Sequence, residues 1–103
     1  MKTGHWDETT DGVLTESTLI SKLVSLGYSC TQYVYPPGTV FPEHDHTVDK
    51  IDAVLSGKFK ITMQGKSVIL EDGDYVYVPK GCTHRAEVIG NNPVVSIDAI
   101  KYD

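Results

Sequence analysis

The sequence has little positive charge, few cysteines and no long apolar run, and each shortage excludes a class of protein. Nine Lys and Arg residues stand against fourteen Asp and Glu, which gives a net charge of −5. Nucleic acid is therefore not expected as a partner, because phosphate binding needs a clustered basic surface. No stretch of about 18 apolar residues is present to cross a membrane, and residues 1–7 lack the apolar core of a signal peptide. Cys30 and Cys82 are too few for a disulfide framework. We expect a cytoplasmic protein with reduced thiols and no membrane or nucleic-acid partner.

The length of 103 residues suits one compact domain. Residues 1–27 form its first part, a polar arm followed by a short amphipathic helix. Thr15 is a suitable N-cap, Leu19 and Leu23 recur at helical spacing, and Gly27 is a typical stop signal. We expect this helix to pack on the rest of the chain, residues 28–103, and we predict no other helix.

From residue 28 onward, short strands alternate with turns. The strand-like segments are residues 28–35, 58–64, 67–70, 75–78, 85–89 and 94–100. Short strands separated by turn residues every eight to twelve positions or so are typical of an antiparallel sandwich or barrel. The predicted fold class is therefore all-β, with one short N-terminal helix.

A pair of histidines, His44 and His46, is the strongest local signal for chemistry. On a strand, side chains two residues apart point to the same face, so both imidazoles would be available to one divalent metal. The pattern alone is weak, because exposed histidines at this spacing also occur without a metal. A third ligand must come from elsewhere, and His84 is the best candidate because His5 lies in the polar arm.

The spacing of glycine, proline and histidine around these positions resembles the two sequence motifs of the cupin superfamily. The matching residues are Gly38, His44, His46 and Gly57 in the first motif, and Gly73, Pro79, Gly81 and His84 in the second. The resemblance covers roughly residues 28 to 100. It implies a small antiparallel double-sheet β-barrel of the jelly-roll type, with the three histidines converging as metal ligands.

Two positions depart from the cupin pattern. Lys50 stands where the first motif usually has a glutamate ligand, and Val88 stands where the second motif often has asparagine. The chain therefore resembles a three-histidine variant. Such variants include dioxygenases that act on thiols, diketones and aromatic acids, as well as cupins without a known reaction.

Lys50 needs a physical explanation if it shares a face with the histidines. An ammonium about 5 Å from a divalent ion is repelled by roughly 6–7 kcal/mol at an effective dielectric constant near 20. Four outcomes are open: the strand changes parity, Lys50 pairs with Asp49 or Asp52, its amine is neutral, or no metal binds. Pairing with Asp52, two residues along on the same face, is the outcome we expect. Lys50 could also lie outside the site, as a solvated lysine beside a bulge.

The sequence thus predicts a small cupin that binds one divalent transition metal, Fe, Mn, Ni or Zn, through His44, His46 and His84. The enzymatic hypothesis is an oxygenase or Lewis-acid reaction on a small, chelating, anionic substrate, with Lys50 and Asp52 as the candidate catalytic residues. The alternative is a non-catalytic ligand-binding or sensing barrel with a degenerate metal site. We also expect a homodimer, formed through exposed strand edges or through the apolar helix face that includes Leu19 and Leu23.

Overall fold

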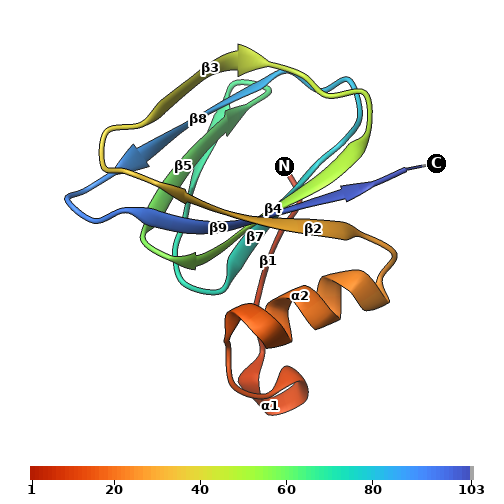
Figure 1. The fold of residues 1–103 in the computed structure, drawn as a ribbon. Helices are drawn as coiled ribbons and strands as arrows, with labels where there is room; N and C mark the ends of the chain where they lie inside the picture. The colour runs from red at the N-terminus through yellow and green to blue at the C-terminus, as the bar shows by residue number, and fades with distance from the viewer. Residues whose placement is uncertain (103) are drawn as a thin grey trace.

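The computed structural model describes residues 1–102 as two helices and nine strands; Asp103, the last residue of the predicted second part, lies outside the described residues. Most of the chain is β-structure, as the sequence predicts (Figure 1). The strands are β1 (Thr3–His5), β2 (Ser29–Tyr35), β3 (Val40–His44), β4 (Asp49–Ser56), β5 (Lys58–Met63), β6 (Lys66–Leu70), β7 (Asp74–Val78), β8 (His84–Ile89) and β9 (Val94–Lys101). The six strands expected after residue 28 are confirmed to within a residue or so at each end.

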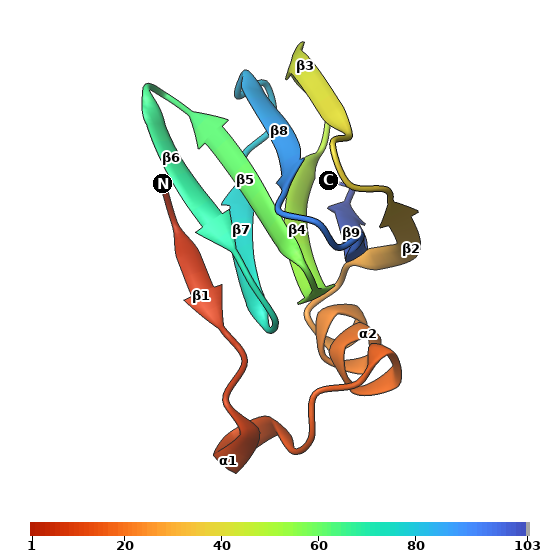
Figure 2. The ribbon, with the colours of Figure 1, turned by 90° about the vertical axis from the view of Figure 1, so that its left-hand side faces the viewer.

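The strands form two antiparallel sheets. One has five strands in the order β1-β7-β4-β9-β2, and the other has four in the order β3-β8-β5-β6. The two sheets lie against each other, as the side view shows (Figure 2). This double-sheet arrangement is the jelly-roll architecture that the sequence motifs imply.

Alternation along β4 and β9 divides the apolar side chains between two cores. Val54 belongs to the cluster between the two sheets, together with residues such as Phe59 and Ile61. Ile51 and Ile97 belong to a second cluster on the opposite face of the five-stranded sheet. Because successive strand residues point to opposite faces, Lys50 and Asp52 share the inner face with Val54. β4 therefore carries two charged side chains into the barrel.

Helix α2 (Glu16–Ser25) covers the outer face of the five-stranded sheet (Figure 1). The side chain of Thr15 accepts a hydrogen bond from the Thr18 backbone, and Gly27 has a φ of 95°, so both predicted helix ends are confirmed. Leu19 and Leu23 are buried in the second core. The apolar face of the helix therefore meets the chain's own sheet, and these two leucines cannot form a dimer interface.

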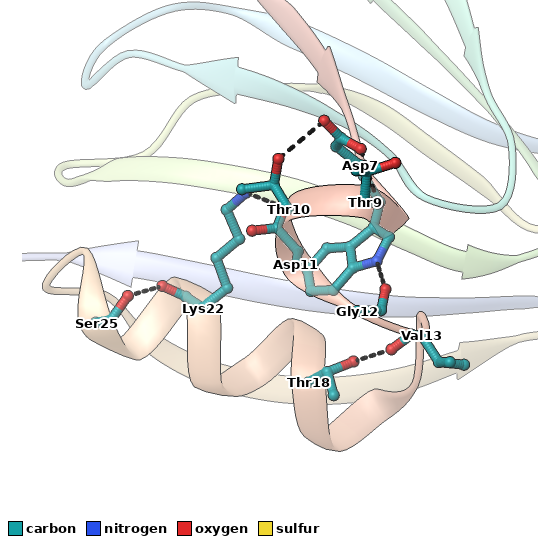
Figure 3. A network of polar contacts seen from close by, with 10 residues as sticks. Asp7, Thr9, Thr10, Asp11, Gly12, Val13, Thr18, Lys22 and Ser25 are labelled. Carbon is teal, nitrogen blue, oxygen red and sulfur yellow. Dashed lines mark hydrogen bonds and ion pairs between the residues drawn. The ribbon is translucent and has the colours of Figure 1, made fainter.

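The prediction of a single helix is wrong, because residues Glu8–Asp11 form a second one, α1. It is four residues long and buries no side chain, so it has no amphipathic pattern to detect. The Asp7 side chain caps it by accepting hydrogen bonds from the Thr9 backbone and the Thr10 hydroxyl (Figure 3). Asp11 in turn pairs with Lys22 of α2, which ties the two helices together.

The polar arm is also more ordered than the sequence indicates. Residues 3–5 pair with β7 as the edge strand β1. Trp6 is buried in the second core, and its indole N–H donates to the Gly12 carbonyl at 2.8 Å. Within residues 1–102, neither helix has the length or the apolar character needed to span a membrane.

Candidate metal centre

Three histidines meet at one end of the barrel. His44 is the last residue of β3, His84 is the first residue of β8, and the two are paired across the strands. A register shift between Phe41 and His44 marks a β-bulge, which turns the end of β3 toward this partner. The expectation that His44 and His46 share one strand is wrong, since β3 ends at His44 and His46 lies in the following loop.

The loop conformation still brings His46 to the other two rings. Its carbonyl accepts a hydrogen bond from the Gly81 N–H at 2.8 Å, and the nearby Asp49 Oδ1 accepts one from the Lys80 N–H at 2.8 Å. Gly81 has a φ of 76°, a conformation that glycine adopts without strain. The turn after β7 therefore holds the segment that contains His46 in place, and the Asp49 side chain contributes one of the two hydrogen bonds to this turn.

The three imidazoles are close enough to share one ion. Their ring centroids are 4.2 Å apart for His44 and His84, 4.9 Å for His44 and His46, and 5.2 Å for His46 and His84. One nitrogen from each ring lies within 4.8 Å of the other two. The three predicted ligands thus converge, and they are positioned to bind a metal ion.

Backbone carbonyls fix the orientation of two of the rings. His44 Nδ1 donates to the Pro42 carbonyl at 2.7 Å, and His84 Nδ1 donates to the Cys82 carbonyl at 3.0 Å. A carbonyl oxygen can only accept, so the proton of each neutral ring sits on Nδ1. The lone pair is left on Nε2, and this is the usual way in which a protein prepares a histidine for a metal.

His46 presents the clearest sign that the site fits a metal. Its Nε2 is buried and has no hydrogen-bond partner among the described residues. Burial lowers the pKa of His46, and the charge of Lys50 lowers it further, which outweighs the opposing effect of Asp98. A divalent ion would give this neutral, buried and unpartnered imidazole nitrogen a partner, so the three histidines fit a metal ion.

A pocket of about 290 Å³ extends from the histidines into the barrel. Aromatic rings form one wall: Tyr35 lies 4.8 Å from Phe41 and 5.6 Å from Phe59, between ring centroids. Burial raises the pKa of Tyr35 to about 12, so its hydroxyl stays protonated at neutral pH. Tyr33 at the edge of the pocket is 44% exposed. The pocket therefore has the size and the apolar lining that suit a small molecule.

A buried ion cluster also lines the pocket. Lys50 Nζ is 3.2 Å from Asp52 Oδ1 and 2.6 Å from Asp98 Oδ1. Lys50 and Asp52 are both buried, and all three side chains line the pocket. The pairing of Lys50 with Asp52 is confirmed. Asp98 is a site residue that the sequence did not reveal, because its position becomes apparent only once β9 is known to lie beside β4.

The cluster changes the protonation behaviour of its members. Burial lowers the pKa of Lys50, but the charges of Asp52 and Asp98 outweigh burial and raise it, so the ammonium stays charged. Burial raises the pKa of Asp52, and the neighbouring Asp98 raises it further against the opposing charge of Lys50. The neutral-amine explanation of Lys50 is therefore wrong.

Comparison with known proteins settles the family. The family model described as "Cupin domain" matches residues 31–100, which is more than half of the chain. The chain belongs to the cupin family. A curated relative is an uncharacterized protein of Methanocaldococcus jannaschii, 30% identical over 67 residues. That match covers 64% of this cupin and 54% of the relative, so the cupin spans about half the relative's length.

Solved structures share the cupin's fold. A cupin-like protein from Thermotoga maritima is 26% identical, with a TM-score of 0.65 over 73% of this chain and 57% of that one. The DMSP lyase DddQ from Ruegeria pomeroyi is 24% identical, with a TM-score of 0.67 over 75% of this chain and 39% of that one. These likenesses agree with the two-sheet architecture described above.

Other candidate ligands of the cupin lie away from the histidine cluster. His5 pairs with Asp74 at 2.6 Å and lines a shallow groove of about 1140 Å³ at the opposite end of the barrel, between the strand turns. Among the residues that the structure describes, His44, His46 and His84 form the only group of three or more possible ligands. The residues that are positioned to bind a metal ion therefore lie at one end of the barrel.

Proposed function

We propose that this cupin binds one divalent transition metal through the Nε2 atoms of His44, His46 and His84. The buried Nε2 of His46, which lacks any hydrogen-bond partner within residues 1–102, is the observation that carries the proposal. The carbonyl contacts of the other two rings support it, because they leave both Nε2 atoms free. Iron, manganese, nickel and zinc all accept imidazole ligands, so the donor set selects none of them.

Three protein ligands leave open coordination positions, which a catalytic metal needs and a structural metal lacks. We propose an oxygenase or Lewis-acid enzyme that acts on a small chelating anionic substrate. When bound, the metal would polarise the oxygens of that substrate or activate a small co-substrate. The rings of Tyr35, Phe41 and Phe59 would exclude water from the bound molecule. The DMSP lyase among the structural neighbours agrees with an enzymatic role for this fold.

The candidate catalytic roles differ between the two residues of β4. Lys50 is held by two carboxylates, so its ammonium is not free to orient a substrate anion. Asp52, whose carboxylate lines the pocket and has a raised pKa, is the better candidate to accept a proton from the substrate. From the amino-acid composition, we also propose that the protein meets its small-molecule ligand in the cytoplasm.

Element analysis of protein purified without a tag and without added metal tests the metal site. We expect close to one transition-metal ion per chain, and its loss in His84→Ala. His5→Ala is the matched control, because His5 is a histidine outside the cluster and should leave the metal content unchanged. Wild-type protein that is empty and also refuses added metal would overturn the proposal.

The second candidate is a ligand-binding or sensing cupin without catalysis, in which lysine stands at the position of the usual glutamate. Oxygen consumption with a panel of thiols, diketones and aromatic acids separates the two candidates. Turnover that depends on His84 supports the enzyme. Metal-loaded protein that binds members of the panel and converts none supports the binding protein.

A further inference from the structure

Asp52 and Asp98 face each other across two neighbouring strands. They are direct partners in the β4–β9 register, and Lys50 bridges them from the same face of β4. Asp52 and Lys50 are buried, whereas about a quarter of the Asp98 side chain is exposed. The Oδ1 atom of Asp98 is buried beside Lys50, and the Asp98 side chain lines the pocket.

The charges of this cluster do not cancel. With Asp52 and Asp98 both ionised, two carboxylates and one ammonium leave a single negative charge on the wall of the pocket. Neutral imidazoles add no charge, so a divalent ion among them keeps its full charge of about +2. Ion and cluster together then carry one net positive charge. Aromatic rings line the same pocket, so water screens these charges less than it would at the surface.

We propose that Asp98, Asp52 and Lys50 act together to set the charge of the metal centre, so that it selects a chelating ligand with one negative charge over one with two. This inference rests on the proposed function, because it requires a metal at the three histidines. A singly charged chelator neutralises the centre. A doubly charged chelator leaves an excess negative charge beside the carboxylates of Asp52 and Asp98, and a charge in this poorly solvated pocket is costly.

Each member of the cluster has its own role in selecting a singly charged ligand. Lys50 holds the two carboxylates together and offsets one of them. Asp98 supplies the charge nearest the open part of the pocket, since it is the most exposed of the three. Asp98 is thus a specificity-determining residue that acts through the electrostatic potential of the site.

Metal binding alone gives the first test. We expect Asp98→Asn to weaken Zn²⁺ or Mn²⁺ binding by about 10- to 100-fold at pH 7.5, because it removes a negative charge from a pocket that water screens poorly. Asp45→Asn is the matched control, because Asp45 carries the same charge in the loop between two ligands but is exposed to solvent. We expect this control to change the affinity by no more than about 3-fold, since solvent screens exposed charges.

Ligand selectivity gives the second test. Acetohydroxamate and oxalate are small chelators that bind as a monoanion and a dianion. In the metal-loaded protein, we expect Asp98→Asn to raise the affinity for oxalate relative to acetohydroxamate by at least about 10-fold, which one removed charge can produce at this range. An unchanged ratio of the two affinities would overturn the inference.

A charge-preserving variant separates the electrostatic role from a structural one. Lys50→Met/Asp52→Asn removes one charge of each sign and leaves Asp98 in place, so it should keep the wild-type preference for acetohydroxamate. Loss of selectivity in this double variant would contradict the charge argument even if Asp98→Asn fails to fold. A wild type without affinity for metal would overturn the proposed function itself. If the wild type binds metal, and Asp98→Asn and Asp45→Asn bind it with equal affinity, only this inference is overturned.

Discussion

Lys50 Nζ lies 2.6 Å from Asp98 Oδ1, across the strand pair β4–β9 and inside the barrel. This contact, together with the one to Asp52, explains how a lysine occupies a position beside a metal-type histidine cluster. Two carboxylates offset the positive charge of the ammonium, which therefore stays inside the barrel and does not extend into solvent. A lysine at this position is therefore compatible with a divalent ion, which the sequence alone did not show.

Removing the Lys50 ammonium should destabilise the protein strongly. Lys50→Met leaves two facing carboxylates without their shared partner, and breaking a buried pair costs about 3–5 kcal/mol. We expect a loss of that size in the free energy of unfolding, measured by urea denaturation of the metal-free protein. Lys60→Met is the control, because Lys60 is partly exposed and 4.0 Å from its partner Glu87, and it should cost less than about 1 kcal/mol.

The double variant Lys50→Met/Asp52→Asn should recover part of that loss. It replaces the most buried carboxylate by a neutral amide, so that Asp98 no longer faces a like charge. A double variant that is as unstable as Lys50→Met, or more so, would show that packing and not charge explains the effect.

Asp52 should make the folded protein more stable as the pH falls, which is the opposite of the usual effect of a carboxyl group. Its pKa is raised by burial and by Asp98, so the folded protein binds the proton more tightly than the unfolded chain does. Its contribution to stability is then fully present below the unfolded value of 3.8 and is lost as the pH rises through the higher folded value. We expect the wild type to gain stability relative to Asp52→Asn as the pH falls from neutral toward the unfolded value of 3.8. Urea denaturation at several pH values measures this difference, and a constant difference would contradict the raised pKa.

The histidine cluster could be predicted from the sequence because its signal is local. Fixed spacings of glycine, proline and histidine specify the turns that bear His44, His46 and His84, so the convergence of the rings did not require knowledge of the whole fold. The error concerned His46, which was assigned to a strand. The bulge in β3 and the contact from Gly81 place it in a loop, and neither has a residue pattern of its own.

Asp98 could not be predicted, because its role depends on which strands are neighbours. The alternation in β9 places Asp98 on one face but does not reveal that β4 lies beside it with Asp52 in register. The short helix α1 was missed for a related reason. A four-residue helix stabilised by the Asp7 cap and by the Asp11–Lys22 pair carries no hydrophobic periodicity.

The packing of α2 on the sheet leads to a further prediction. Leu23 is 4% exposed and lies in the core between the helix and the sheet, so Leu23→Ala should lower the free energy of unfolding by about 2–5 kcal/mol. Val24→Ala is the neighbouring control: Val24 is 53% exposed, and its change should stay within about 0.5 kcal/mol. Equal effects of the two substitutions would mean that the helix does not pack as the structure shows. Metal content should remain unchanged in both variants, since the site lies within the barrel.

Strand β2 is the edge that we expect a second copy of the chain to cover. It ends the five-stranded sheet, and its seven residues, SCTQYVY, include no charge and no proline. Edge strands usually carry charged residues or proline, which protect them against pairing with another chain. Val34 is 58% exposed in β2, and antiparallel pairing of two β2 strands satisfies the two-fold symmetry of a homodimer.

Val34→Lys should therefore convert the dimer to a monomer, because it places two like charges at the symmetric interface. Light scattering after size-exclusion chromatography measures the change, with the mass of two chains expected for the wild type and of one chain for the variant. Val24→Lys, a lysine on the exposed side of α2, should remain a dimer. A monomeric wild type, or an unaffected Val34→Lys dimer, would remove β2 as the interface.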